Sequence, residues 1–395
     1  MQVVQKTTTN DRHQRQPQMA AGRFCEDLVA DILCYMPVKS VVRFRCLNKY
    51  YDDMILSDPR FGTKHALRFP PQVHGLFRFT AHDGCSPCSF TMRMLFLCPV
   101  IASCNGLLLH VLSNSKLCVV NPTTGKYKVV PDPKTASLPY GKWHLGLAYD
   151  PVNLGSVEYR IVYVYVAAVV AGEDVCAFEI FDSAANSWRK SKTMLRCSSK
   201  GAYFKGQAVY LNGALHWVRD CVEIVAFDVE KEYATLIDLP SPLADRRVGY
   251  FSWFGAVKGL IYLVGATGDE IRTWVLHDYG KRRWGFVTNF IGFGGMSGGL
   301  VSIVFFDDEL LLVECNKVIL MYNMKQEKWS VGLDWLKASG MGTTGVFIPF
   351  VPALAPISGS SSSDADFIGS LVQQLSDNTV STTREARGRK RKAES

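Results

Sequence analysis

The sequence lacks the features that would place it in a membrane or in the secretory pathway. Its longest apolar run, residues 161–171, is much shorter than the ~20 residues that cross a bilayer, and its valines favour a strand. The first 22 residues are polar and contain no apolar segment of a signal peptide. The zinc-protease motif H-E-x-x-H is also missing. We therefore expect no membrane partner and no secretion.

The chain has little net charge outside its two ends. Residues 1–23 carry a net +3 and residues 384–392 a net +5, which together equal the formal net charge of +8. A nucleic-acid-binding domain concentrates basic side chains on its folded body. The neutral body therefore predicts protein partners and no nucleic acid.

Few of the twelve cysteines are close enough in sequence to act together. Most stand singly in apolar segments, where a free cysteine behaves as a small hydrophobic side chain. This usage favours a reducing compartment, so we expect the protein in the nucleus, the cytoplasm or both. Cys85 and Cys88, with His82 nearby, have ligand-like spacing, but a structural zinc site needs a second pair. We expect a loop with incidental thiols, and no metal or cofactor.

Residues 24–65 have the spacing of a small helical module. Pro37 ends a first helix, Ser40 can cap a second, and Asp58-Pro59 begins a third. So few residues cannot bury all their apolar side chains alone, so part of this surface should meet another domain or protein. The apolar positions of the first two helices are Leu28, Ile32, Leu33, Met36, Val41, Phe44, Leu47, Tyr51, Met54 and Ile55.

This segment resembles the plant F-box family. The resemblance lies in the order E-D-L, I-L, M-P-V-K-S-V, F-R-C-L-N-K, D-P-R-F and K-H between residues 26 and 65. The family usually has Leu-Pro where this chain has Phe24-Cys25, and Trp where it has Tyr51. The resemblance implies a trihelical surface that binds the scaffold protein Skp1. The residues implied in that contact are Leu28, Ile32, Leu33, Met36, Pro37, Val41, Phe44 and Tyr51.

Residues 100–335 contain a repeated unit of short strands. Each copy has a glycine turn between apolar strands, then an Asx or charged turn, then a late aromatic residue. The aromatics Trp188, Tyr233, Trp284 and Trp329 are spaced by 45, 51 and 45 residues. This period is typical of the blades of a β-propeller, and we expect the aromatics to pack between blades.

The repeats resemble plant F-box/kelch-repeat proteins and their F-box-associated domain, including the Asn121-Pro122 turn. The predicted fold is an α+β multidomain protein, with a trihelical F-box followed by an all-β, kelch-type propeller of about six blades. The sixth blade would combine strands from 68–100 with a late strand at 345–351. The expected domains are a disordered tail (1–23), the F-box module (24–66), the propeller (67–352) and a disordered Ser-rich, basic tail (353–395).

Other candidate sites have plain structural interpretations. The glycine-rich residues 292–299 precede a predicted strand, whereas a phosphate cradle precedes a helix, so we interpret them as an inter-strand loop. His110, His144, His216 and His277 are dispersed through predicted strands. The basic tail suits a nuclear-import signal or a solubilising tail. The candidate import residues are Arg387, Arg389, Lys390, Arg391 and Lys392.

The resemblance implies a non-catalytic substrate adaptor of a Skp1–cullin–F-box (SCF) ubiquitin ligase. Its partners would be a Skp1-like protein, a cullin reached through Skp1, and an unknown protein substrate bound by propeller loops. One alternative is a propeller enzyme or ligand-binding protein with a helical cap, which would need converging ionisable groups. Another is an F-box protein that acts outside degradation.

Overall fold

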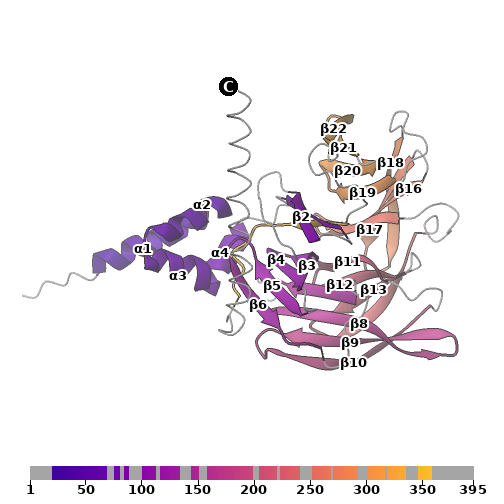
Figure 1. The fold of residues 1–395 in the computed structure, drawn as a ribbon, viewed down its shortest axis with the longest axis horizontal. Coiled ribbons are helices and arrows are strands. Elements are labelled where there is room, and N and C mark those ends of the chain that lie inside the picture. The colour runs from indigo at the N-terminus through magenta and orange to yellow at the C-terminus, as the bar shows by residue number, and fades with distance from the viewer. Residues whose placement is uncertain are drawn as a thin grey trace, which may run out of the picture.

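The protein consists of a small helical module joined to a ring of β-sheets (Figure 1). The structure, a computed structural model, describes these residues: 20–68, 75–80, 84–88, 100–112, 116–133, 144–150, 158–198, 204–219, 223–240, 251–267, 270–291, 301–315, 318–334 and 346–357. No helix among them is long and apolar enough to cross a membrane.

The helical module, residues 20–68, contains four α-helices and one 3-10 turn. They are α1 (Ala20–Leu33), α2 (Val38–Arg43), η1 (Phe44–Cys46), α3 (Lys49–Ser57) and α4 (Pro59–Arg68). The continuous second helix that we expected is broken, and Ser40 lies inside α2 rather than at its cap. Asn48 caps α3, where its Oδ1 accepts a hydrogen bond from the Tyr51 N–H at 3.0 Å. This competing cap explains why the apolar stripe does not form one helix.

The helical module has its own core, to which the segment after β23 contributes one residue. Apolar side chains of α1 to α4 pack around Leu33 and Val41, and Leu354 joins them from beyond the last strand. His65 of α4 is buried, and its Nε2 is 2.9 Å from the Met36 carbonyl oxygen, which ties α4 to the turn after α1. Burial lowers the pKa of His65, so the neutral ring is the one that fits this core.

The β-region is organised in six antiparallel sheets among the described residues. One is three-stranded, in the order β2 (Gly84–Cys88), β1 (Gly75–Thr80), β23 (Val346–Phe350). Five are four-stranded blades. Blade B holds β3 (Val100–Cys104), β4 (Leu107–Val111), β5 (Leu117–Asn121) and β6 (Lys126–Val130). Blade C holds β7 (Leu145–Tyr149), β8 (Tyr159–Val170), β9 (Glu173–Asp182) and β10 (Ser187–Cys197).

The remaining three blades repeat the same order of strands. Blade D holds β11 (Phe204–Leu211), β12 (Ala214–Arg219), β13 (Glu223–Asp228) and β14 (Tyr233–Asp238). Blade E holds β15 (Phe251–Val257), β16 (Leu260–Thr267), β17 (Glu270–Asp278) and β18 (Arg283–Ile291). Blade F holds β19 (Val301–Phe306), β20 (Leu310–Cys315), β21 (Val318–Asn323) and β22 (Lys328–Asp334).

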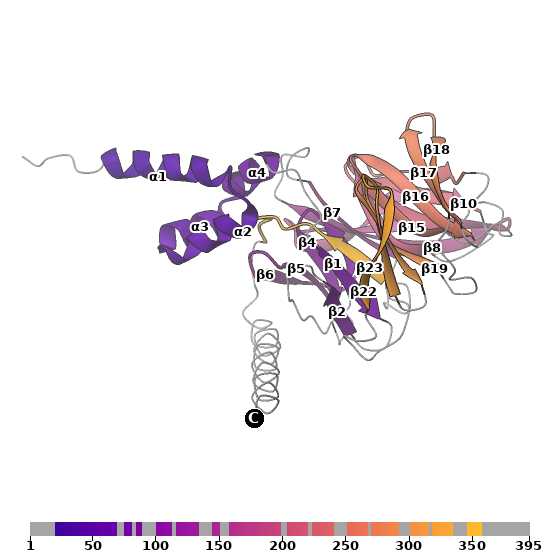
Figure 2. The ribbon, with the colours of Figure 1, turned by 90° about the horizontal axis from the view of Figure 1, so that it is seen from above.

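The sheets form a closed β-propeller. The first strands of blades B to F contact one another in sequence, and β23 lies between β19 and β3 (Figures 1 and 2). β23 pairs with β1, with Phe77 opposite Ile348, so strands from both ends of the β-region build one sheet. The predicted propeller of about six blades, and its closure by early and late strands of the chain, are confirmed.

Each four-stranded blade ends its third strand with a side chain that caps the next turn. The residues at this position are Asn121, Asp182, Asp228, Asp278 and Asn323. In each case Oδ1 accepts a hydrogen bond from a backbone N–H two or three residues later, as in Asp182 with Ala184 at 2.9 Å. This is an Asx turn, and it explains the repeated Asx or charged position in the sequence.

The late aromatic residues only partly have the predicted core role. Trp188 is buried between blades B and C, and its Nε1–H donates to the Pro131 carbonyl oxygen. Trp284 makes the same kind of bond to Asp238 of the preceding blade. Tyr233, however, is 65% exposed, so the prediction was wrong there. Tyr233 lies opposite Asp228, whereas Trp188 and Trp329 lie opposite the residue before the Asx position, so Tyr233 is shifted by one residue and is on the other face of its strand.

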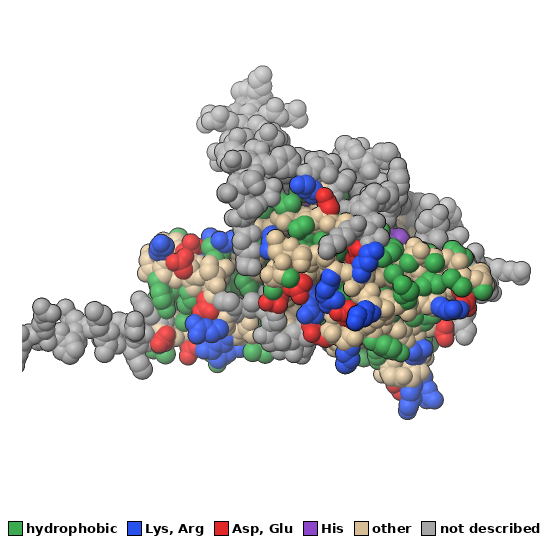
Figure 3. All heavy atoms as spheres, turned by 90° about the horizontal axis from the view of Figure 1, so that it is seen from below, with side chains coloured by type: hydrophobic (Ala, Val, Ile, Leu, Met, Phe, Trp, Pro, Cys, Tyr) green, Lys and Arg blue, Asp and Glu red, His purple; other side chains and the backbone are tan. Residues whose placement is uncertain are grey.

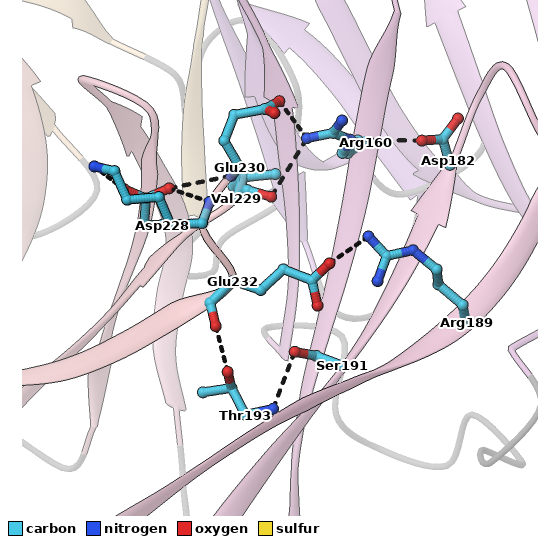
Figure 4. A network of polar contacts seen from close by, with 10 residues as sticks. Arg160, Asp182, Arg189, Ser191, Thr193, Asp228, Val229, Glu230 and Glu232 are labelled. Atoms are coloured by element: carbon cyan, nitrogen blue, oxygen red, sulfur yellow. Dashed lines mark hydrogen bonds and ion pairs between the residues drawn. The ribbon is translucent and has the colours of Figure 1, made fainter.

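Blades C and D are joined by apolar and polar contacts. Phe178 and Phe227 stack with their ring centroids 4.4 Å apart. Near the turn between β13 and β14, Arg160 of blade C lies between Asp182 and Glu230, and Arg189 pairs with Glu232 at 2.5 Å (Figure 4). The hydrogen bonds and ion pairs fix the lateral position of the blades, which apolar contacts alone leave less specified.

A buried histidine joins blades D and E and should make stability depend on pH. The Nδ1 of His216 is 3.1 Å from the Val209 carbonyl oxygen, and Nε2 is 2.9 Å from the Tyr279 hydroxyl. Burial lowers the pKa of His216 to about 4. In the unfolded chain the histidine is protonated as the pH falls below about 6.5, whereas in the folded chain it stays neutral down to about pH 4. The stabilisation by the neutral, buried histidine is therefore fully present above pH 6.5 and is lost as the pH falls toward 4.

We expect this histidine alone to remove about 2 kcal/mol of unfolding free energy between pH 7 and pH 5. Urea unfolding of the wild type and of His216→Gln at both pH values measures the effect, because the other titrating groups are common to both proteins. The variant should lose less stability on acidification. An equal loss in both proteins would contradict the prediction.

Candidate functional site

The helical module exposes part of the apolar set that the F-box resemblance implied. Leu28 and Ile32 of α1 are 53% and 54% exposed, and Pro37 is exposed as well. Met36, Phe44 and Tyr51 are half-buried. Leu33 and Val41 are buried in the core of the module, where they support its shape but offer no surface. The predicted contact set therefore divides into surface positions and core positions.

Tyr35, Leu47 and Tyr50 are also exposed, although they are not in the contact set that the resemblance implied. Tyr35 follows Leu28 and Ile32 at helical spacing, and Leu47 and Tyr50 flank the cap of α3. The Arg68 guanidinium lies 3.9 Å from the Tyr35 ring centroid, a cation–π contact that orients the ring. The spacing of Tyr35 was visible in the sequence, whereas the exposure of Leu47 depends on the break between η1 and α3.

Ion pairs connect the helices of the module. Figure 3 shows hydrophobic side chains on the module between acidic and basic ones. Lys64 of α4 pairs with Asp31 of α1, and this hydrogen bond lowers the pKa of Asp31. The Arg45 Nε lies 2.7 Å from an Asp52 carboxylate oxygen. An apolar centre with a charged rim is the usual composition of a protein-binding surface.

The two ends of the propeller differ in their connections. At one end lie the short turns within blades, such as Asn105-Gly106 between β3 and β4 and the Asx turns; the helical module lies at this end. At the opposite end lie the turns between the second and third strands of the blades, such as Ala171-Gly172 between β8 and β9. The second end is therefore the one free of the helical module (Figures 1 and 2).

The hairpin of β8 and β9 projects at the end away from the helical module (Figure 1). Residues 167–173 are all exposed, and Val169 is 65% exposed. Met194 on the neighbouring strand β10 is also exposed. Exposed apolar side chains on a projecting hairpin are suited to contact with another protein. No residue here was singled out from the sequence, because a run of alanine and valine also fits a buried strand.

The cysteines and histidines in the described part of the chain form no metal centre. No group of three or more His, Cys, Asp or Glu side chains among them could hold a metal ion. Cys85 and Cys88 lie on strand β2, so the expected loop there was wrong. His144 forms a hydrogen bond with the Val164 carbonyl oxygen in blade C, and His216 forms one with the Val209 carbonyl oxygen in blade D. These bonds account for both histidines as structural residues.

Two sequence features lie outside the described residues. Residues 292–299 contain Gly295-Met-Ser-Gly-Gly299, which matches the G-x-S-x-G spacing of a nucleophile elbow. That motif requires a helix after the serine, whereas the next element here is strand β19, so the context does not fit. The predicted import signal within 387–392 is the second such feature.

The fold defines a class: a β-propeller protein with an N-terminal helical module. The model of the F-box associated beta propeller domain matches residues 96–347. Among curated relatives, a putative F-box/kelch-repeat protein of Arabidopsis thaliana is 27% identical over 327 residues, covering 77% of this chain and 71% of that one. A second, also from Arabidopsis thaliana, is 26% identical over 347 residues, covering 77% and 82%. The chain belongs to the plant F-box proteins with an F-box associated beta propeller domain.

Proposed function

We propose that this protein is the substrate-recognition subunit of an SCF-type ubiquitin ligase and has no catalytic role of its own. The observation that supports this most is the surface of the helical module. Leu28 and Ile32 stay exposed although Leu33, Val41 and their neighbours already complete a core. The exposed parts of these side chains do not stabilise the free protein. Burying them against a Skp1-like protein would contribute to the free energy of binding.

In this proposal the propeller holds the protein substrate, and the cullin joins through Skp1. The opposite end of the ring, with the β8–β9 hairpin, is the surface we propose for the substrate, because the helical module occupies the other end. The two binding events are then separated by the thickness of the propeller. The protein contributes proximity, which raises the effective concentration of substrate at the ligase.

Reconstitution with purified components tests the proposal. The full chain is mixed with a plant Skp1-like protein and then with the matching cullin, and each mixture is analysed by size-exclusion chromatography with light scattering. We expect a one-to-one complex with the Skp1-like protein and a ternary complex with the cullin. No binary complex would refute the adaptor role. A binary complex that excludes the cullin would favour an F-box protein acting outside degradation.

We also propose that the protein is found in the nucleus, the cytoplasm or both. The support is the basic cluster of residues 387–392 and the predominance of single cysteines in the sequence. Imaging of a fluorescent fusion, with Arg389, Lys390 and Arg391 changed to alanine in a second version, tests the import role. Unchanged nuclear accumulation in the alanine version would refute it.

A further inference from the structure

The residues after the last strand lie between the helical module and the propeller. The chain leaves β23 at Phe350 and continues through residues 351–357. We expected a disordered tail to begin at residue 353. That expectation was wrong for 353–357, because Leu354, Ala355 and Ile357 are all buried. We call residues 353–357 the strap.

The strap contacts both parts of the protein at once. Leu354 is a member of the helical core, whereas Ala355 and Ile357 belong to the core between blades B and C. The contacts are close: a Cβ added to Gly62 of α4 would lie 2.7 Å from the Leu354 carbonyl oxygen. A Cβ added to Gly106 would lie 2.5 Å from the Ala353 Cβ. A larger side chain at either glycine would therefore clash with the strap.

Asn121 holds the strap through its side-chain amide. Its Nδ2 donates to the carbonyl oxygens of Ala353, at 3.0 Å, and Ala355, at 2.7 Å, and the residue is fully buried. Its Oδ1 meanwhile caps the Asx turn of blade B. The equivalent residues of blades C, D and E are aspartates, which cap their turns equally well but have no N–H to donate. The turn therefore does not require asparagine in blade B, but the strap does.

We propose that Asn121 and the strap fix the orientation of the helical module on the propeller. The only covalent connection between the module and β1 is the stretch 69–74, and a single connection does not set an orientation. The strap adds a second attachment, made of two buried hydrogen bonds and the Leu354 anchor. In the adaptor role, on which this consequence rests, a fixed orientation keeps substrate at a constant distance from the ligase.

Hydrogen–deuterium exchange of the full chain tests the strap directly. Asn121→Asp keeps the oxygen that caps the turn but replaces the donor with an oxygen that repels the two carbonyls. We expect amides of residues 351–357 and of α4 to exchange about tenfold faster or more, since two buried hydrogen bonds are lost. Asn323→Asp is the matched control, because Asn323 caps its turn in the same way and has no strap contact among its hydrogen bonds. Equal exchange in Asn121→Asp and the wild type would overturn the proposal.

X-ray scattering tests the orientation itself. Leu354→Ser removes the anchor from the helical core, and we expect a larger maximum dimension and a broader distance distribution than in the wild type. Leu67→Ser, at an exposed position of α4, should leave both unchanged. An unchanged distribution in Leu354→Ser, with normal helical content by circular dichroism, would overturn the proposal. Both experiments use the chain without partners, so their failure is separate from a failure to bind a Skp1-like protein.

Discussion

Replacing Leu28 and Ile32 together with aspartate is expected to weaken binding to a Skp1-like protein by about a thousandfold, since each of two central apolar contacts contributes about 2 kcal/mol. Both side chains are more than half exposed and lie outside the core of the module, so the substitution removes little packing from the free protein. The unfolding temperature should therefore stay within a degree or two of the wild-type value. Isothermal titration calorimetry and thermal unfolding of the same samples measure the two quantities.

Two controls separate binding from folding. Leu67→Asp places the same charge at another exposed apolar position of the helical module, where we expect little loss of affinity. Leu33→Asp places it in the core of the module, where both affinity and stability should fall. If the double variant bound as tightly as the wild type, α1 would not be the contact surface. If it unfolded early, the loss of binding would be indirect.

Replacing Arg219 with methionine is expected to lower the unfolding free energy by about 3–5 kcal/mol. The Arg219 side chain is 1% exposed and pairs with Asp174 of blade C and with Glu223 of blade D, at 2.9 Å for Glu223. One of its Nη atoms also donates to the Ser198 carbonyl oxygen. Methionine fills a similar volume but leaves two nearly buried carboxylates without a cation. Chemical unfolding measures the loss.

The energy of this cluster lies in its pairing, which a second set of variants can show. Arg219→Met combined with Asp174→Asn and Glu223→Gln removes all three charges and should recover much of the lost stability. Arg196→Met is the matched control, because the Arg196–Glu173 pair is nearby and largely exposed, and we expect a change within about 0.5 kcal/mol. A mild effect of Arg219→Met, similar to that of Arg196→Met, would show that the buried pairs contribute little.

Local sequence signals predicted the helical module well where a short motif sets the start of a helix. Asp58-Pro59 begins α4 as expected, and the Asp58 Oδ1 accepts a hydrogen bond from the Arg60 N–H. The break between α2 and α3 was missed because the apolar stripe continues through it. Asn48 starts a new helix at α3 by capping it, and this role is visible only in the hydrogen bond that its side chain accepts.

Repetition predicted the propeller for a physical reason. Every blade meets the same demands, a tight turn, an Asx cap and two covered faces, so the same residue types return at each period. The spacing of the aromatics did not predict the exposure of Tyr233, because a shift of one residue in strand register moves a side chain to the other face of the sheet. The long-range ion pairs around Arg219 and Arg160 left no trace in the sequence pattern, since their partners lie on different blades.

The sequence by itself determined the two-part architecture, the strand repeats and the candidate F-box surface, because these follow from spacing within short segments. Only the tertiary structure decided which apolar residues of α1 and α2 remain exposed, since Leu28 and Leu33 belong to the same stripe, but Leu33 is buried in the core of the module and Leu28 is exposed. It also decided the role of Asn121 and residues 353–357, which are more than 200 positions apart. The contact forms because closure of the propeller by β23 brings residues 353–357 next to blade B, and local sequence patterns do not predict such long-range neighbours.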